Sequence, residues 1–95
     1  MHIREFQKLI KEEYYEKDKR RGKDKTFLWF IEEIGELSEA LRKEKREMIE
    51  KEMADVFAWL CSIANLLGID IEMLSIDKYE KGCPRCGKIP CQCKE

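Results

Sequence analysis

The sequence lacks several features that would direct it to other classes of protein. Its one histidine, His2, lies at the chain terminus and is expected to have no functional role. The 19 basic and 20 acidic residues nearly cancel, so the excess positive charge typical of nucleic-acid-binding domains is absent. No positively charged segment followed by an apolar run opens the chain, and the longest mainly apolar run, Val56–Ile69, is too short to span a membrane. We therefore expect a cytoplasmic protein that binds neither nucleic acid nor membrane.

What remains is a pattern of amphipathic helices. A chain of 95 residues has material for one core, and the division into 43% hydrophobic and 41% charged residues suits helices with one apolar face. Apolar residues recur at spacings of three and four, and no strand-like alternation is present. This period predicts helices over about Ile3–Lys17, Lys25–Lys43, Glu47–Leu67 and Asp70–Lys81. The fold class is therefore predicted to be all-α, an antiparallel bundle of about four helices.

The connections between these helices are also predicted from residue types. The stretch Lys17–Lys25 has no apolar residue and contains Gly22, so we expect a solvated loop there. Asp24 or Thr26 is expected to cap the helix that follows. The turn between the second and third helices is short, which predicts that these two helices pack antiparallel.

The end of the chain differs from the rest in composition. Gly68 is placed to terminate the third helix, and Asp70 is placed to cap the fourth, in which Leu74 is expected to contact the core. A cysteine-rich segment then follows. We therefore divide the chain into a helical domain, residues 1–81, and a tail, residues 82–95.

Two pairs of acidic residues stand out in neighbouring predicted helices. Glu33 and Glu36 form one pair and Glu52 and Asp55 the other, and residues three positions apart share a helix face. If the helices pack antiparallel the pairs meet, and four carboxylates then require a cation, for which Mg²⁺ or Mn²⁺ suits oxygen ligands. A solvated or salt-bridged acidic face is the alternative. The metal site is favoured because Asp55 lies among Ala54, Val56, Phe57 and Ala58 in the most apolar helix of the chain, where a carboxylate needs a partner.

At these residues the chain resembles a known family. The segments EEIGEL (Glu32–Leu37) and EKEMADV (Glu50–Val56) resemble the MazG-type nucleotide pyrophosphohydrolases of the all-α NTP pyrophosphatase superfamily. The segments Arg20–Lys43 and Leu66–Glu72 also fit the family pattern. The resemblance implies a helical catalytic domain that is dimeric or a dimer of dimers. It also implies hydrolysis of a (deoxy)nucleoside triphosphate between its α and β phosphates, which yields the monophosphate and pyrophosphate and serves nucleotide-pool house-cleaning.

The resemblance also assigns roles to the acidic residues. By matching position, Glu33 and Glu36 are implied as the first pair of Mg²⁺ ligands, and Glu52 and Asp55 as the second. Glu32 is implied either as a group of the outer shell or as the group that orients a water molecule. The metal would activate the attacking water and neutralise phosphate charge, so no cysteine, serine or histidine nucleophile is required.

A triphosphate site also needs cations and a surface for the base. Lys78, near the end of the last predicted helix, and Arg21 are candidate substrate contacts, although a solvated lysine is an equally ordinary role for Lys78. Trp29 lies one helical turn before the first acidic pair and is a candidate contact for the base or sugar. Core packing is its alternative role. Trp59, one turn after the second pair, has the same two candidate roles. The other candidate cations are Arg20, Lys23 and Lys81.

The tail contains four cysteines in eleven residues, Cys83, Cys86, Cys91 and Cys93. This spacing predicts a structural Zn²⁺ site, because a short segment without a core gains stability from a closed thiolate site. Disulfide pairing, an iron–sulfur centre and ligands shared between two chains are the alternatives. Cys61 lies among apolar residues and is expected to be an inert buried thiol.

Two other functions compete with the main hypothesis. One is phosphoribosyl-ATP pyrophosphohydrolase, a relative with the same arrangement of helices and metal but a biosynthetic substrate. The other is a non-catalytic interaction module, stabilised by zinc, in which the acidic residues form an ordinary surface. The second alternative leaves the acids of the apolar helix without an explanation.

Overall fold

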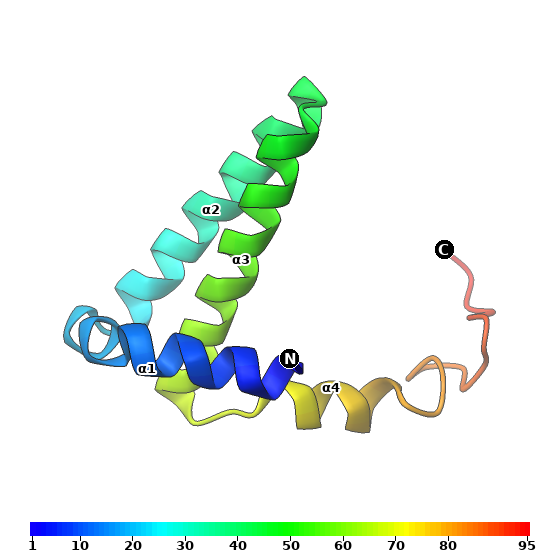
Figure 1. Cartoon of the computed structure of the whole chain (residues 1–95). Helices are drawn as coiled ribbons and strands as arrows, with labels where there is room; N and C mark the ends of the chain where they lie inside the picture. The colour runs from blue at the N-terminus through cyan, green and yellow to red at the C-terminus, as the bar shows by residue number, and fades with distance from the viewer.

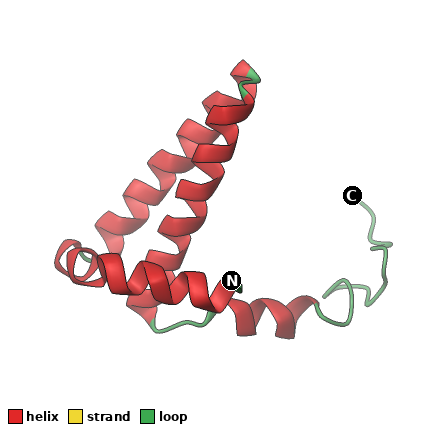
Figure 2. Ribbon diagram, in the orientation of Figure 1, coloured by secondary structure: helices red, strands yellow, loops and turns green.

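A computed structural model describes residues 1–95 as four helices without a strand (Figure 2). The helices are α1 (Ile3–Arg21), α2 (Lys23–Lys43), α3 (Arg46–Leu67) and α4 (Ile71–Tyr79). The predicted all-α class is therefore confirmed. No single helix is apolar over a length that would cross a membrane, although α3 and α4, bent by 100°, pass that criterion when taken together.

Helices α2 and α3 form an antiparallel arm, which α1 crosses at its base (Figure 1). The turn between α2 and α3 is short, as predicted, and Glu44 occupies it with a left-handed φ of 54°. Helix α1 packs against α3, where the rings of Phe6 and Phe57 stack with 5.3 Å between their centroids. Helix α4 lies beside the beginning of α1, away from the arm. The acidic pairs therefore lie on the arm, and the tail follows α4, away from the arm.

The junction between α1 and α2 differs from the predicted loop. Helix α1 continues to Arg21, and only Gly22, with a φ of 89°, separates it from α2. The expectation of a solvated loop at residues 17–25 is wrong because Asp18 is only 2% exposed and pairs with the Arg21 guanidinium at 2.8 Å. Arg21 also donates a hydrogen bond to the hydroxyl of Thr26, which is fully buried. Neither Asp24 nor Thr26 caps α2, since its N-cap is Gly22.

The corner between α3 and α4 follows the predicted caps. Gly68 ends α3 in the left-handed region with a φ of 67°, and its N–H donates to the carbonyl of Asn65 at 3.3 Å. Asp70 caps α4, because its carboxylate accepts a hydrogen bond from the backbone N–H of Met73 at 3.1 Å. Helix α4 ends at Tyr79, slightly before the predicted end at Lys81.

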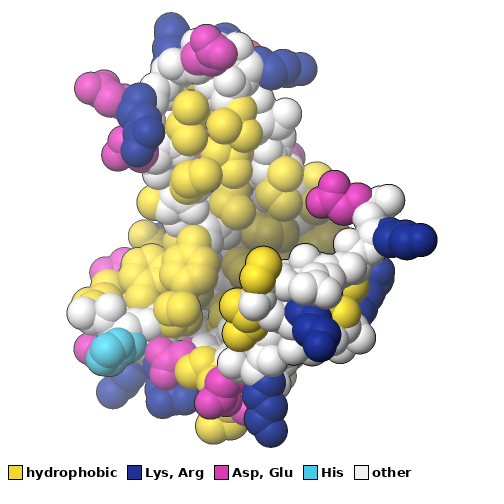
Figure 3. Space-filling model, turned by 90° about the vertical axis from the view of Figure 1, so that its right-hand side faces the viewer, with side chains coloured by type: hydrophobic (Ala, Val, Ile, Leu, Met, Phe, Trp, Pro, Cys, Tyr) yellow, Lys and Arg dark blue, Asp and Glu magenta, His cyan; other side chains and the backbone are white.

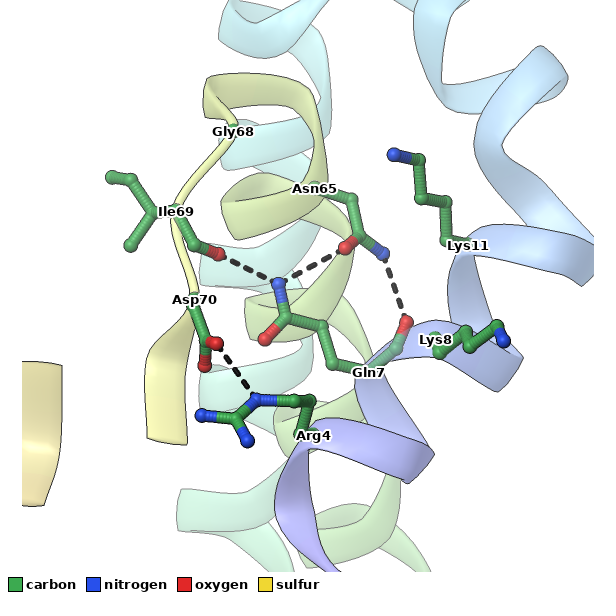
Figure 4. A pocket seen from close by; sticks show the side chains of 8 residues that line it. All are labelled: Arg4, Gln7, Lys8, Lys11, Asn65, Gly68, Ile69 and Asp70. Atoms are coloured by element: carbon green, nitrogen blue, oxygen red, sulfur yellow. Dashed lines mark hydrogen bonds and ion pairs between the residues drawn. The ribbon is translucent and has the colours of Figure 1, made fainter. Parts of the chain in front are cut away.

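A polar network joins this corner to α1, as Figure 4 shows. The Gln7 amide donates to the side-chain oxygen of Asn65 at 3.0 Å and to the carbonyl of Ile69 at 2.7 Å. Beside it, the Arg4 guanidinium donates to the Asp70 carboxylate at 2.8 Å. The network borders an open recess of about 290 Å³. Because these polar groups satisfy one another, they hold α4 beside α1.

One face of the arm is hydrophobic and uncovered. Leu28 on α2 is 61% exposed and Met53 on α3 is 55% exposed, and Figure 3 shows hydrophobic side chains gathered on the arm and in the hollow at its base. Other exposed side chains of the arm are Phe27, Ile31, Ile34, Leu41, Met48 and Leu60. Leu74 is also exposed, so the expectation that it joins the core is wrong for a single chain. The cause is that α4 packs mainly on α1 and leaves the arm without a third helix along its length.

Candidate active site

Three carboxylates meet on the arm where α2 lies beside α3. Glu33 and Glu36 are one turn apart on α2, and Glu52 comes from α3, which runs in the opposite direction. One oxygen of each lies within 4.8 Å of the others. Glu52 is only 8% exposed, Glu33 is half-buried and Glu36 is exposed. We call these three residues the acidic cluster; the antiparallel packing brings it together as the spacing predicted.

The acidic cluster contains polar atoms that nothing in the chain satisfies. One carboxylate oxygen of Glu33 and one of Glu52 are buried without a hydrogen-bond partner. Burial raises the pKa of Glu33 from an ordinary 4.5 to about 7, and the neighbouring carboxyls of Glu52 and Glu36 add to the effect. No ion pair of the structure involves any of the three residues. The cluster therefore needs a proton, or a cation from outside the chain, to offset the cost of burying these carboxylates.

The chemistry of these ligands fits a small divalent cation. All three donors are carboxylates, which are hard oxygen ligands, and two of them present an oxygen with no competing partner. Exposed Glu36 leaves one side of the cluster open to solvent, where water or phosphate oxygens would complete the coordination shell of a bound cation. The cluster thus offers free carboxylate oxygens as ligands for Mg²⁺ and an open side from which a substrate can approach.

The other two predicted acids are placed differently. Asp55 lies outside the acidic cluster, although its charge contributes to the raised pKa of Glu33. Glu32 is exposed on α2 and is not part of the cluster. Three of the five predicted acids therefore converge, a fourth lies near them, and the fifth faces solvent.

Asp55 borders a cavity of about 210 Å³ between α1 and α3. The cavity is lined by Tyr14 and Asp18 of α1 and by Asp55, Trp59 and Ser62 of α3. One oxygen of Asp18 is buried without a partner, as in the acidic cluster. Sequence reasoning missed Asp18, because its spacing of three from Arg21 is that of any surface ion pair. Only the packing of α1 on α3 shows that this pair is buried.

Two tryptophans and two cations lie next to this cavity. The rings of Trp29 and Trp59 meet edge to face with 5.6 Å between centroids. The Arg21 guanidinium lies 4.3 Å from the centroid of Trp29 and 5.1 Å from that of Trp59, and the Lys25 ammonium is 5.6 Å from Trp29. Trp29 is 38% exposed, so part of the residue is packed and part is accessible to solvent. Its two predicted roles are therefore compatible with each other.

The remaining candidate cations are not gathered at the acids. Lys78 borders a recess formed with the cysteine tail, and its ammonium is 5.6 Å from the ring of Tyr79. Lys23 pairs with Asp24 at 3.0 Å, while Arg20 donates to a backbone carbonyl within α1. Lys81 is exposed beyond the end of α4. Within one chain, Arg21 and Lys25 are thus the cations that accompany the tryptophan pair.

The family model of the MazG nucleotide pyrophosphohydrolase domain matches residues 21–87, which is more than half of the chain. The chain belongs to this family. The matched segment of this MazG domain contains the acidic cluster, Asp55 and both tryptophans. It begins at Arg21, so most of α1, including Asp18, lies outside it. No curated protein matches the chain.

The match also reaches into the tail, and it ends at Gly87 between the two pairs of cysteines. Cys83 and Cys86 therefore lie inside the matched MazG segment, and Cys91 and Cys93 lie beyond it. The fifth cysteine, Cys61, is fully buried in α3 as predicted, and burial raises the pKa of its thiol. A buried, protonated thiol is a poor nucleophile, which agrees with its expected inert role.

Proposed function

We propose that this MazG domain hydrolyses nucleoside triphosphates, including deoxynucleoside triphosphates, to the monophosphate and pyrophosphate in the presence of Mg²⁺. The observation that supports the proposal is the acidic cluster, whose two buried, unpartnered oxygens belong to carboxylates from two helices. An ordinary acidic surface would keep such oxygens in water. Removal of unwanted triphosphates from the nucleotide pool is the cellular role we propose for this activity.

In this proposal Glu33, Glu36 and Glu52 hold Mg²⁺, or Mn²⁺ in its place, and Asp55 supports the site through its charge. A cation held there would supply a coordinated water of lowered pKa and would offset the negative charge of the phosphates. Glu32, exposed beside the cluster, is proposed to orient the attacking water. The cation would balance the negative charge of these acids, so they would stay ionised. It would take the place of the proton that Glu33 otherwise holds near pH 7.

The nucleoside is proposed to bind at the cavity beside Asp55. Its volume of about 210 Å³ is below the range of about 300 Å³ and more that encloses drug-sized ligands, so it suits a base or a sugar alone. The unpartnered Asp18 oxygen can accept a hydrogen bond there, and Trp29, which packs against Trp59 of the cavity lining, is partly exposed. Arg21 is proposed to contribute positive charge toward the phosphates. Lys78 would reach a triphosphate only from a second copy of the chain.

We also propose that a second copy covers the hydrophobic face of the arm. Large aliphatic and aromatic side chains on both α2 and α3 are exposed there, and contiguous apolar surface of this kind marks an interface. A homodimer, or a dimer of dimers, would give the arm the additional helices that a single chain lacks.

The reaction is tested by identifying the products from each triphosphate with Mg²⁺ present. We expect pyrophosphate and the monophosphate from wild type, and a loss of about 100-fold or more in Glu36→Gln, the scale for removing a group that stabilises charge in the transition state. Glu39→Gln is the matched control, since Glu39 lies one turn further along α2 and pairs with Lys43. Release of orthophosphate, or equal rates in the two variants, would contradict the proposal.

The same assay separates the competing functions. Phosphoribosyl-ATP is included in the substrate panel, and a rate with it that far exceeds all triphosphate rates would replace the proposed substrate class. A non-catalytic module would show neither turnover nor Mg²⁺ binding in calorimetry. We expect Mg²⁺ binding by wild type and Glu39→Gln that is weakened in Glu36→Gln.

A further inference from the structure

The tail after α4 has little structure apart from its cysteines. It contains no helix, and its backbone hydrogen bonds stay within residues 79–88. No ion pair connects it to the helices. Even so, the sulfur atoms of Cys83, Cys86, Cys91 and Cys93 all lie within 4.8 Å of one another. Holding four thiols together in a segment without a hydrophobic core costs conformational entropy, so a further interaction has to offset that cost.

The distances between the sulfurs match a tetrahedral metal site. The Cys83 sulfur lies 3.7 Å from that of Cys93 and 3.6 Å from that of Cys91. A disulfide would require about 2.05 Å. Four sulfurs at about 2.3 Å from a central zinc ion, in tetrahedral directions, are separated from one another by about 3.8 Å. The observed spacing is thus that of ligands around one ion, and all four cysteines are free.

The backbone around the first pair of cysteines forms a closed turn. The N–H of Gly87 donates to the carbonyl of Cys83 at 2.7 Å, and the N–H of Cys83 donates to the carbonyl of Lys88 at 3.1 Å. Gly87 has a φ of 71°, a backbone conformation that residues other than glycine rarely adopt. This turn directs the sulfurs of Cys83 and Cys86 to the same side, toward the second pair.

Backbone N–H groups also point at the sulfurs. The N–H of Gln92 lies 3.4 Å from the Cys86 sulfur, and that of Cys93 lies 3.3 Å from the Cys91 sulfur. Such donors stabilise a thiolate, which is the form that binds metal, and they complete the outer shell of a thiolate site.

We propose that Cys83, Cys86, Cys91 and Cys93 of a single chain bind one Zn²⁺ ion in a closed tetrahedral site that folds the tail. Four protein ligands leave no position for substrate or water, so the site is structural. All four sulfurs come from one chain, and no second copy is needed to complete the site. The proposal is independent of the acidic cluster, whose oxygen ligands lie on the arm.

The first test measures the zinc content of purified protein by mass spectrometry of the element. We expect one Zn²⁺ per chain in wild type and in Cys61→Ala, the control that removes the buried fifth thiol. Cys86→Ser and Cys93→Ser are expected to lose most of the zinc after dialysis. Equal zinc content in wild type and in both tail variants would overturn the proposal. Glu36→Gln is expected to keep its zinc, which separates this site from the proposed Mg²⁺ site.

Replacement of Zn²⁺ by Co²⁺ tests the geometry. Tetrahedral thiolate coordination gives intense visible ligand-field bands, which we expect in wild type at one Co²⁺ per chain and at all protein concentrations. A ratio of one Co²⁺ per two chains would show ligands shared between chains and would overturn the single-chain site. Stoichiometric iron with sulfide, or four cysteines that fail to alkylate after denaturation without reductant, would instead establish a cluster or disulfides and would overturn it.

Trypsin provides a readout that does not depend on spectroscopy or activity. Arg85 and Lys88 lie in the exposed tail and are cleavage sites in a flexible segment. We expect slow cleavage there in the zinc-loaded protein and rapid cleavage in Cys86→Ser, with the helices cut at equal rates in both. Equal cleavage of the tail with and without zinc would contradict a folding role for the metal.

Discussion

At the scale of single residues, Glu33 shows how a site can be recognised by what it lacks. Its buried oxygen has no partner, and burial together with Glu52 and Glu36 raises the pKa of its carboxyl to about 7. Glu52 has an oxygen of the same kind, and Asp18 presents a third in the neighbouring cavity. Residues with strongly shifted pKa values gather at functional sites, because a structure rarely retains such a cost without a use.

The raised pKa of Glu33 has a consequence for stability without Mg²⁺. Between pH 4.5 and about 7 the folded protein keeps a proton that the unfolded chain has released, so this residue makes stability fall as the pH rises. We expect urea unfolding midpoints, measured without added divalent ions, to fall less between pH 5 and pH 7.5 in Glu33→Gln than in wild type. Glu39→Gln should follow wild type. Parallel pH profiles for wild type and Glu33→Gln would contradict this explanation.

At the scale of elements, the junction of α1 and α2 depends on a buried ion pair. The exposed fractions of the Arg21 and Asp18 side chains are 14% and 3%, and Arg21 also contacts Thr26 and both tryptophans. This contact explains why the chain turns at Gly22 without a solvated loop. The junction therefore sets the position of α1 over the cavity beside Asp55.

Breaking this pair is expected to destabilise the protein by about 3 to 5 kcal/mol, because it leaves a buried charge without compensation. Arg21→Met should show this loss in urea denaturation, and the double variant Asp18→Asn with Arg21→Met should recover part of it. Lys23→Met is the control, since Lys23 forms an exposed pair with Asp24. If Arg21→Met is no less stable than this control, the pair does not organise the junction.

At the scale of the whole molecule, one chain has too little core for its hydrophobic content. Only nine of its 95 residues are buried, and they are spread over α1, α2 and α3. The arm extends away from α1 with its apolar face uncovered, and the molecule measures 42 × 35 × 27 Å. The proposed second copy and the proposed tail zinc would each supply stability that a single helical core of this size does not.

The proposed dimer predicts that charge on the arm separates the chains. Leu28 is 61% exposed in one chain, so Leu28→Lys should cost a monomer little, whereas a buried lysine in the interface weakens association. We expect light scattering to show a dimer or larger assembly for wild type and a shift toward monomer for Leu28→Lys. Ile89→Lys, a change at an exposed tail residue, should leave the mass of the assembly the same as in wild type. A monomeric wild type would contradict the proposed assembly.

Removal of the tail zinc is expected to affect stability more than turnover, because the tail follows α4 and lies away from the arm that carries the acidic cluster (Figure 1). Zinc can be extracted with phenanthroline, whose nitrogen donors bind Zn²⁺ in preference to Mg²⁺. The melting temperature of the extracted protein should fall, while turnover with excess Mg²⁺ at low temperature should largely remain. An unchanged melting temperature with abolished turnover would show that the tail metal is not structural.

The sequence by itself determined the local features of this protein. Helical periodicity, the terminator Gly68 and the cap Asp70 act through contacts within a few residues, so they can be read along the chain. The convergence of Glu33 and Glu36 with Glu52 was also predictable, because a short turn forces two amphipathic helices to pack antiparallel.

Only the tertiary structure decided which polar residues are buried and which apolar residues are not. Asp18 and Arg21 look like a surface pair until α1 packs on α3, and Leu28 looks like a core residue until the arm extends away from α1. The sequence does not distinguish Lys78 from the other candidate cations, but the position of α4 places it beside the tail. Burial and proximity between distant segments depend on how helices are arranged in space, and a periodic pattern gives the direction of a face without naming its neighbour.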